Sequence, residues 1–96
     1  MNKKQNGTQL EIALEGPLDT VTAPELEQAL TQSLRDVTAL TLDFSHVDYI
    51  TSAGLRVLLS ARKTLKGKGA MKITHINEIV GEVFDVTGFT KILTIE

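Results

Sequence analysis

Two adjacent hydroxyl side chains, Thr51 and Ser52, stand where residue type and spacing in this sequence most suggest chemistry. They follow an alternating apolar run at 39–44 and a short polar loop, and they precede an apolar segment with helical spacing. In the first turn of a helix about four backbone N–H groups lack internal partners, and the helix dipole is positive there. This setting favours added negative charge, so Ser52 is predicted to be a phosphorylated switch. Position alone leaves the alternative open, in which Ser52 is simply a helix N-cap.

The same serine lacks the surroundings of a catalytic nucleophile. The run Ile50-Thr51-Ser52-Ala53-Gly54 does not have the first glycine of the nucleophile elbow. The run Lys66-Gly67-Lys68-Gly69 follows an expected helix, whereas a phosphate-binding loop precedes one. His46 and His75 are far apart in the sequence with no thiol nearby, which gives no metal-ligand spacing. We therefore expect no catalysis, no bound metal and no cofactor, and we expect both histidines to be structural or solvent-facing.

Strand and helix periods alternate along the chain. The first helix has a clear start, with Thr22 expected as its N-cap, Pro24 in its first turn and Glu25 closing a capping box. The expected strands are 9–15, 39–44 and 71–76, with a short extended piece at 18–19 and an edge strand at 91–95. The expected helices are 22–34, 52–65 and 79–88. This order predicts one α/β domain over residues 1–96, with a mostly parallel mixed sheet, one antiparallel edge, and helices packed on it.

Composition narrows the class of protein. The chain has 96 residues, 42% hydrophobic and 23% charged, with a net charge of −2 and no cysteine. These values are ordinary for a globular domain, and the absence of thiols fits a cytoplasmic location. A protein without a basic surface and with few aromatic residues is not expected to bind nucleic acid directly. Residues 1–7 are polar and are expected to form a loose tail, and no apolar run is long enough for membrane insertion.

Loops that follow parallel strands gather at one end of a sheet. We therefore expect residues 19–22, 46–52 and 76–78 to form one contiguous surface, called the rim below. Asp19 either lies on this rim as a functional residue or simply ends a strand and begins a turn. Gly54 either permits close approach of a partner or serves helix–sheet packing, because a helical glycine needs a reason.

The element order and three sequence segments resemble the STAS domain family, and in particular its bacterial anti-sigma factor antagonists. These segments are Gly16-Pro17-Leu18-Asp19, Asp43-Phe44-Ser45 and Tyr49-Ile50-Thr51-Ser52-Ala53-Gly54-Leu55. In that family the serine two places before the glycine is phosphorylated, which corresponds to Ser52. The commonest family form has aspartate where this chain has Thr51 and a second serine where it has Ala53. Thr51 is therefore a second candidate acceptor.

The resemblance implies a regulatory cycle in the cytoplasm. The unmodified chain would bind an anti-sigma factor that is also a serine protein kinase, and so release the sigma factor. Phosphorylation of Ser52 would break that complex, and a metal-dependent phosphatase of the PP2C type would reset it, with ATP and Mg²⁺ belonging to the partners. The alternative is a STAS-type structural subunit of a membrane-associated lipid-transport complex. The residues expected to contact the partner are Asp19, Thr20, Thr22, Tyr49, Thr51, Ser52, Ala53, Gly54, Leu55 and Asn77.

Overall fold

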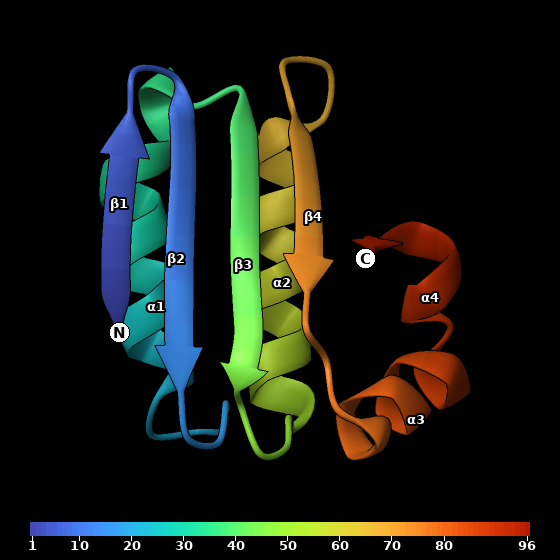
Figure 1. Ribbon diagram of the computed structural model, residues 1–96. Helices are drawn as coiled ribbons and strands as arrows, with labels where there is room; N and C mark the ends of the chain where they lie inside the picture. Colours follow the sequence, from blue (N-terminus) through green and yellow to red (C-terminus); the bar gives the residue numbers. More distant parts are fainter.

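The computed structural model describes residues 1–96 as one sheet with helices packed against it (Figure 1). Five strands lie in the spatial order β1-β2-β3-β4-β5. The strands are β1 (Asn2–Asn6), β2 (Gln9–Glu15), β3 (Ala39–His46), β4 (Ala70–Thr74) and β5 (Thr94–Ile95). The helices are α1 (Ala23–Ser33), a short 3-10 turn η1 (Leu34–Asp36), α2 (Ser52–Leu65), α3 (Glu78–Thr87) and α4 (Phe89–Ile92). The expected mixed α/β fold is confirmed.

The expected loose tail at residues 1–7 is wrong. Residues 2–6 form β1, which pairs antiparallel with β2 and provides the antiparallel edge of the sheet. All five residues of β1 are exposed, so the strand has no buried alternation that local sequence reasoning could detect. Its main-chain pairing with β2 orders it instead.

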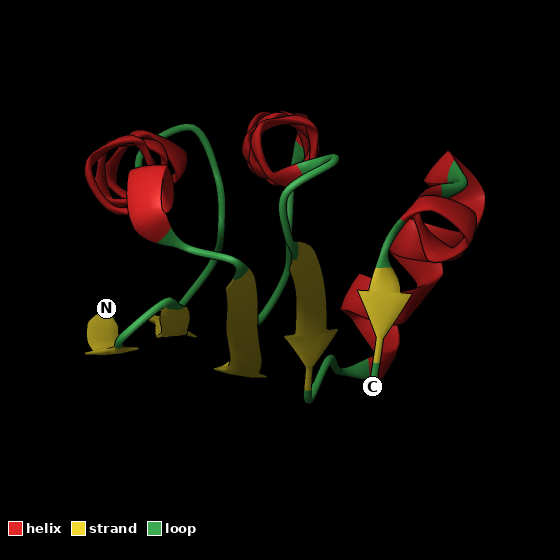
Figure 2. Cartoon of the chain, turned by 90° about the horizontal axis from the view of Figure 1, so that it is seen from above, coloured by secondary structure: helices red, strands yellow, loops and turns green.

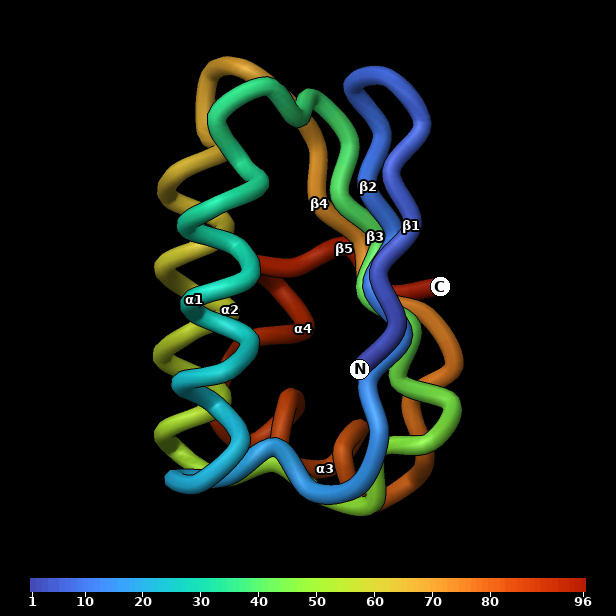
Figure 3. The backbone as a smooth tube through the Cα atoms, turned by 90° about the vertical axis from the view of Figure 1, so that its left-hand side faces the viewer, coloured from blue at the N-terminus to red at the C-terminus, as the bar shows by residue number.

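The remaining strand pairs are parallel, and α1 and α2 lie together on one face of the sheet (Figure 2). Side chains at alternate strand positions point toward these helices and make the core, as Leu10, Ile12 and Leu14 do on β2. Phe44 on β3 packs against Phe84 of α3, with ring centroids 6.3 Å apart. The tube in Figure 3 shows the helix layer on one side and the strand layer on the other. Because β2, β3 and β4 run parallel, the loops that follow these three strands lie at one end of the molecule (Figure 1).

The start of α1 differs from the predicted capping box. Thr22 is at the N-cap position but makes no side-chain cap bond to the helix. Its hydroxyl instead donates to the Pro17 carbonyl at 2.7 Å and accepts from the Asp19 N–H at 3.0 Å. The hydroxyl therefore holds the turn that enters the helix, and the expected role of Glu25 is not observed.

The C-terminal prediction holds in part. Helix α3 ends at Gly88, which has a left-handed backbone with φ of 81°. Residues 89–92 form the short helix α4, so the expected edge strand is limited to β5, which pairs parallel with β4. Within α3 the side chains of Val80 and Phe84 are buried, whereas Ile79 is exposed. The extended piece near Leu18 is a single parallel bridge to Ile50.

Candidate functional site

Ser52 is the first residue of α2, and its side chain is exposed. Thr51 occupies the N-cap position with an extended backbone, so the expected N-cap role of Ser52 belongs to its neighbour. The first turn of α2 contains no acidic residue. An exposed hydroxyl at the positive end of a 14-residue helix can accept a phosphoryl group without unfavourable contact with the helix dipole.

Thr51 has the opposite environment. Its hydroxyl oxygen is buried and has no hydrogen-bond partner. The Thr51 N–H donates to the Leu18 carbonyl at 3.0 Å, and its own carbonyl accepts from the Leu55 N–H at 3.0 Å. The backbone of this residue is thus fixed on both sides. Between the two candidate acceptors, exposure favours Ser52.

Backbone hydrogen bonds join the loop after β2 to the loop after β3. Gly16 N–H donates to the His46 carbonyl at 2.8 Å, and Leu18 N–H donates to the Tyr49 carbonyl at 2.9 Å. In return, the Asp48 N–H donates to the Gly16 carbonyl at 3.3 Å. These bonds extend the parallel pairing of β2 and β3 past the ends of both strands. They hold the segment that leads to Asp19 beside the loop that leads to Ser52.

Asn77 attaches the third segment of the rim. Its side-chain amide donates to the carbonyls of Val47 and Asp48 at 3.1 and 3.0 Å. Its side-chain oxygen accepts from the Val80 N–H at 2.7 Å and so caps α3. The predicted contiguity of the rim is therefore confirmed, and Asn77 is the side chain that connects α3 to the loop leading to Ser52.

Asp19 forms the turn before α1 and lies half-buried on the rim. One carboxylate oxygen accepts from the Val21 N–H at 2.9 Å and from the Thr22 N–H at 3.1 Å. Hydrogen bonding from the Thr22 backbone N–H, followed by smaller contributions from Val21 and the Thr22 hydroxyl, holds the pKa of Asp19 below its ordinary value against opposing desolvation. The two interpretations of Asp19 are compatible, because the residue builds a turn on the rim.

Two apolar side chains are exposed on the rim beside the polar ones. Val21 is 80% exposed and Tyr49 is 43% exposed. Thr20 is exposed as well, while Thr22 is half-buried. Val21 was not among the expected contact residues. The sequence could have indicated it, because Val21 is a β-branched apolar residue inside an otherwise polar turn. Exposed apolar side chains among polar groups are typical of protein contact surfaces.

Gly54 faces the protein interior and not the solvent side of the rim. A Cβ atom built on it would lie 2.7 Å from Cγ1 of Ile50, and 2.8 Å from both Cγ and the carbonyl oxygen of Leu18. The expectation that Gly54 exposes backbone to a partner is therefore wrong, and its alternative, packing, is correct. Ala53 and Leu55 are half-buried and pack against the core.

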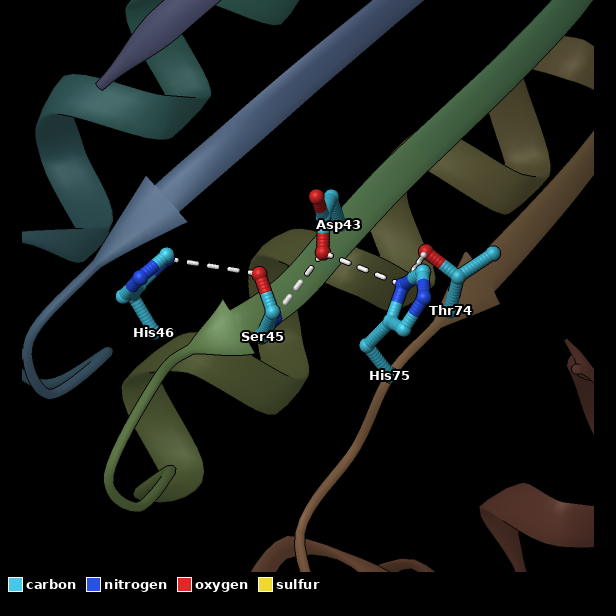
Figure 4. Close-up of polar contacts among 5 residues, drawn as sticks. All are labelled: Asp43, Ser45, His46, Thr74 and His75. Atoms are coloured by element: carbon cyan, nitrogen blue, oxygen red, sulfur yellow. Dashed lines mark hydrogen bonds and ion pairs between the residues drawn. The ribbon is translucent and has the colours of Figure 1, made fainter.

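A polar cluster lies at the same end of the sheet, on the face without helices (Figure 4). Asp43 accepts from the Ser45 N–H at 2.9 Å, and its carboxylate is 3.3 Å from Nδ1 of His75. The Ser45 bond, more than the charges of His75 and His46, lowers the pKa of Asp43. The Thr74 hydroxyl is 3.0 Å from the same ring nitrogen, Nδ1. Since both partners contact one nitrogen, the ring cannot relay a proton between them as in a catalytic triad.

The side of the rim next to α1 offers little room for a small substrate. The hollow between Pro17 and Glu25 has a volume of about 50 Å³, far below the roughly 300 Å³ at which ligand pockets begin. No three acidic, histidine or cysteine side chains gather in an arrangement that could hold a metal ion. None of the helices has the length and apolar character needed to cross a bilayer. The exposed side chains of Val21 and Tyr49 are the feature of the rim that suits contact with another protein.

Comparison with known proteins agrees with this geometry. The anti-sigma-B factor antagonist of Bacillus subtilis is 29% identical over 93 residues, which cover 96% of this chain and 85% of the relative. The crystal structure of an anti-sigma factor antagonist from Mycobacterium paratuberculosis matches with a TM-score of 0.88 and 25% identity, over 98% of this chain and 81% of that one. The Bacillus cell fate determinant SpoIIAA in its phosphorylated form shares the fold, with a TM-score of 0.77 and 16% identity over 99% of this chain and 89% of that one. The STAS domain model matches residues 1–96, and the chain therefore belongs to the STAS domain family.

Proposed function

We propose that this chain is an anti-sigma factor antagonist whose binding is controlled at Ser52. The observation that carries the proposal is the exposed Ser52 at the start of α2, set among the polar and apolar side chains of the rim. Relatives that carry the antagonist name support it, and favour it over a structural subunit of a transport complex. In this role the chain binds another protein and performs no catalysis.

The proposed cycle acts in the cytoplasm. The unmodified rim binds an anti-sigma factor, which thereby releases its sigma factor. The same partner acts as a serine protein kinase: it transfers the γ-phosphoryl group of ATP to the Ser52 oxygen, with release of ADP and the hydroxyl proton. ATP and Mg²⁺ are bound by that kinase. A PP2C-type phosphatase hydrolyses the phosphoserine and restores the binding form.

The energetics allow the fold and the binding to respond differently. A phosphoserine carries about −1.5 to −2 charges at neutral pH. The N-terminus of α2 favours this charge by about 0.3 to 2 kcal/mol, so the fold tolerates it. Burial of the same charge in an interface without a counter-charge costs several kcal/mol, and each 1.4 kcal/mol is about tenfold in affinity. We expect phosphorylation to weaken partner binding by roughly 100-fold or more.

The test incubates the purified chain with ATP, Mg²⁺ and a purified anti-sigma factor kinase, and measures binding and phosphate uptake. Ser52→Ala is expected to keep its melting temperature and its affinity for the kinase but to take up no phosphate. Ser52→Asp is expected to stay folded and bind weakly. Ser60→Asp is the matched control, because Ser60 is exposed on the same helix but lies outside the rim. Phosphate uptake by Ser52→Ala, or equally weak binding by both aspartate variants, would refute the proposal.

A further inference from the structure

The Thr51 hydroxyl oxygen is the buried side-chain polar atom that lacks a hydrogen-bond partner in this structure. Such an atom has lost its hydrogen bonds to water without replacing them, which costs free energy. Buried polar groups in folded proteins are nearly always paired, so an exception needs a physical reason. The exception here is the residue directly before Ser52.

Local structure offers Thr51 a partner that it does not use. A threonine at an N-cap commonly accepts from a backbone N–H in the first turn of the helix. Helix α2 has no such bond, whereas Asn77 makes the equivalent bond for α3 at 2.7 Å. The first backbone N–H of α2 with a helical partner belongs to Leu55, which donates to the Thr51 carbonyl. The end of α2 therefore keeps unpaired donors next to Ser52.

The freedom left to Thr51 is in its side chain. Its N–H and its carbonyl are both hydrogen-bonded, to Leu18 and Leu55. Rotation about χ1 moves the hydroxyl among three staggered positions while the backbone stays in place. At an N-cap with extended backbone, one of these positions brings the hydroxyl to the helix end, where an anion also binds. A nearby acceptor would therefore make rotation out of the buried position favourable.

We propose that Thr51 is the residue that holds the phosphoryl group of phosphorylated Ser52, with its hydroxyl donating to a phosphate oxygen. This inference rests on the proposed modification of Ser52. In the unmodified chain the hydroxyl stays buried and unpaired; in the modified chain it gains a charged acceptor. Thr51 is thus a positioning residue and not itself an acceptor of phosphate.

The test places phosphoserine at position 52 by genetic encoding, so that it does not depend on any kinase. The full chain is made with Thr51, with Thr51→Val, which matches threonine in shape but has no hydroxyl, and with Thr51→Ser, which restores the hydroxyl. The phosphorus NMR signal of each protein is followed during a pH titration. A donor to the phosphate favours the dianion and lowers the pKa of the phosphate.

We expect the titration midpoint of Thr51→Val to lie at higher pH than that of the parent, and Thr51→Ser to return it toward the parent value. Melting of the unmodified proteins gives a second readout: Thr51→Val should melt higher, because it removes an unpaired buried hydroxyl. Equal phosphate midpoints in all three proteins would overturn the inference. Failure of the kinase to modify Ser52 would instead count against the proposed function, since the encoded phosphoserine needs no kinase.

Discussion

Substitution of Gly54 by alanine tests the packing of α2 against the rim. Two effects of this substitution oppose each other. The first is helix preference, which favours alanine over glycine by about 1 kcal/mol. Against this, the new Cβ would lie 2.8 Å from the Leu18 carbonyl oxygen and 2.7 Å from Ile50. That carbonyl accepts the Thr51 N–H at 3.0 Å, so it cannot move without disturbing the loop before Ser52. The backbone contact makes this clash difficult to relieve.

Overpacking of this kind costs about 1–3 kcal/mol, and weakening of the Leu18–Thr51 bond adds about 1 kcal/mol. After the helix preference is subtracted, Gly54→Ala should lower the free energy of unfolding by about 2 kcal/mol. For a domain of this size, the melting temperature should fall by about 8–16 °C. Thermal melts followed by circular dichroism measure this change.

Gly81→Ala is the matched control. Gly81 also lies within a helix, α3, but its added Cβ would meet only the Ile76 side-chain tip at 3.6 Å, an ordinary contact. Helix preference alone then applies, and Gly81→Ala should stabilise the protein by up to about 1 kcal/mol. A Gly54→Ala protein that gains as much stability as Gly81→Ala would refute the packing argument.

Three further predictions concern the loops around the rim. His75 has a left-handed backbone with φ of 60°, so His75→Gly should be more stable than His75→Ala by about 1 kcal/mol. Equal melting temperatures of the two variants would refute strain at this residue. Asn77→Ala should lower the free energy of unfolding by about 2 kcal/mol, because it removes the α3 cap and two hydrogen bonds to the loop. Asn77→Asp keeps the cap acceptor but not the amide donor, so chemical denaturation of both variants separates the two contributions. The pKa of Asp43 is lowered in the folded protein, so its ionised carboxylate stabilises the fold at pH values above the ordinary pKa of aspartate. This stabilisation is lost as pH falls through the lowered pKa. As pH falls below about 4, the parent should therefore lose more stability than Asp43→Asn in acid titrations, and parallel titration curves would contradict this.

Local periodicity in the sequence was enough to predict most of the elements and the end of the sheet at which the rim lies. Strands β2, β3 and β4 alternate buried and exposed residues, and the glycine-rich run after Leu65 ends α2. Once these strands are parallel, their following loops must lie together. The rim and the position of Ser52 followed from these patterns, because each pattern depends on residues near one another in the chain.

The tertiary structure decided the features that depend on distant contacts. Strand β1 is fully exposed and is specified by pairing with β2, so no pattern within it marks a strand. The inward direction of Gly54 depends on how α2 is rotated against Leu18 and Ile50. The Thr51 hydroxyl is buried while its neighbour Ser52 is exposed, although the sequence places two similar hydroxyls side by side. Consecutive residues at a helix start point in different directions, and only packing against the rest of the chain determines which one reaches solvent.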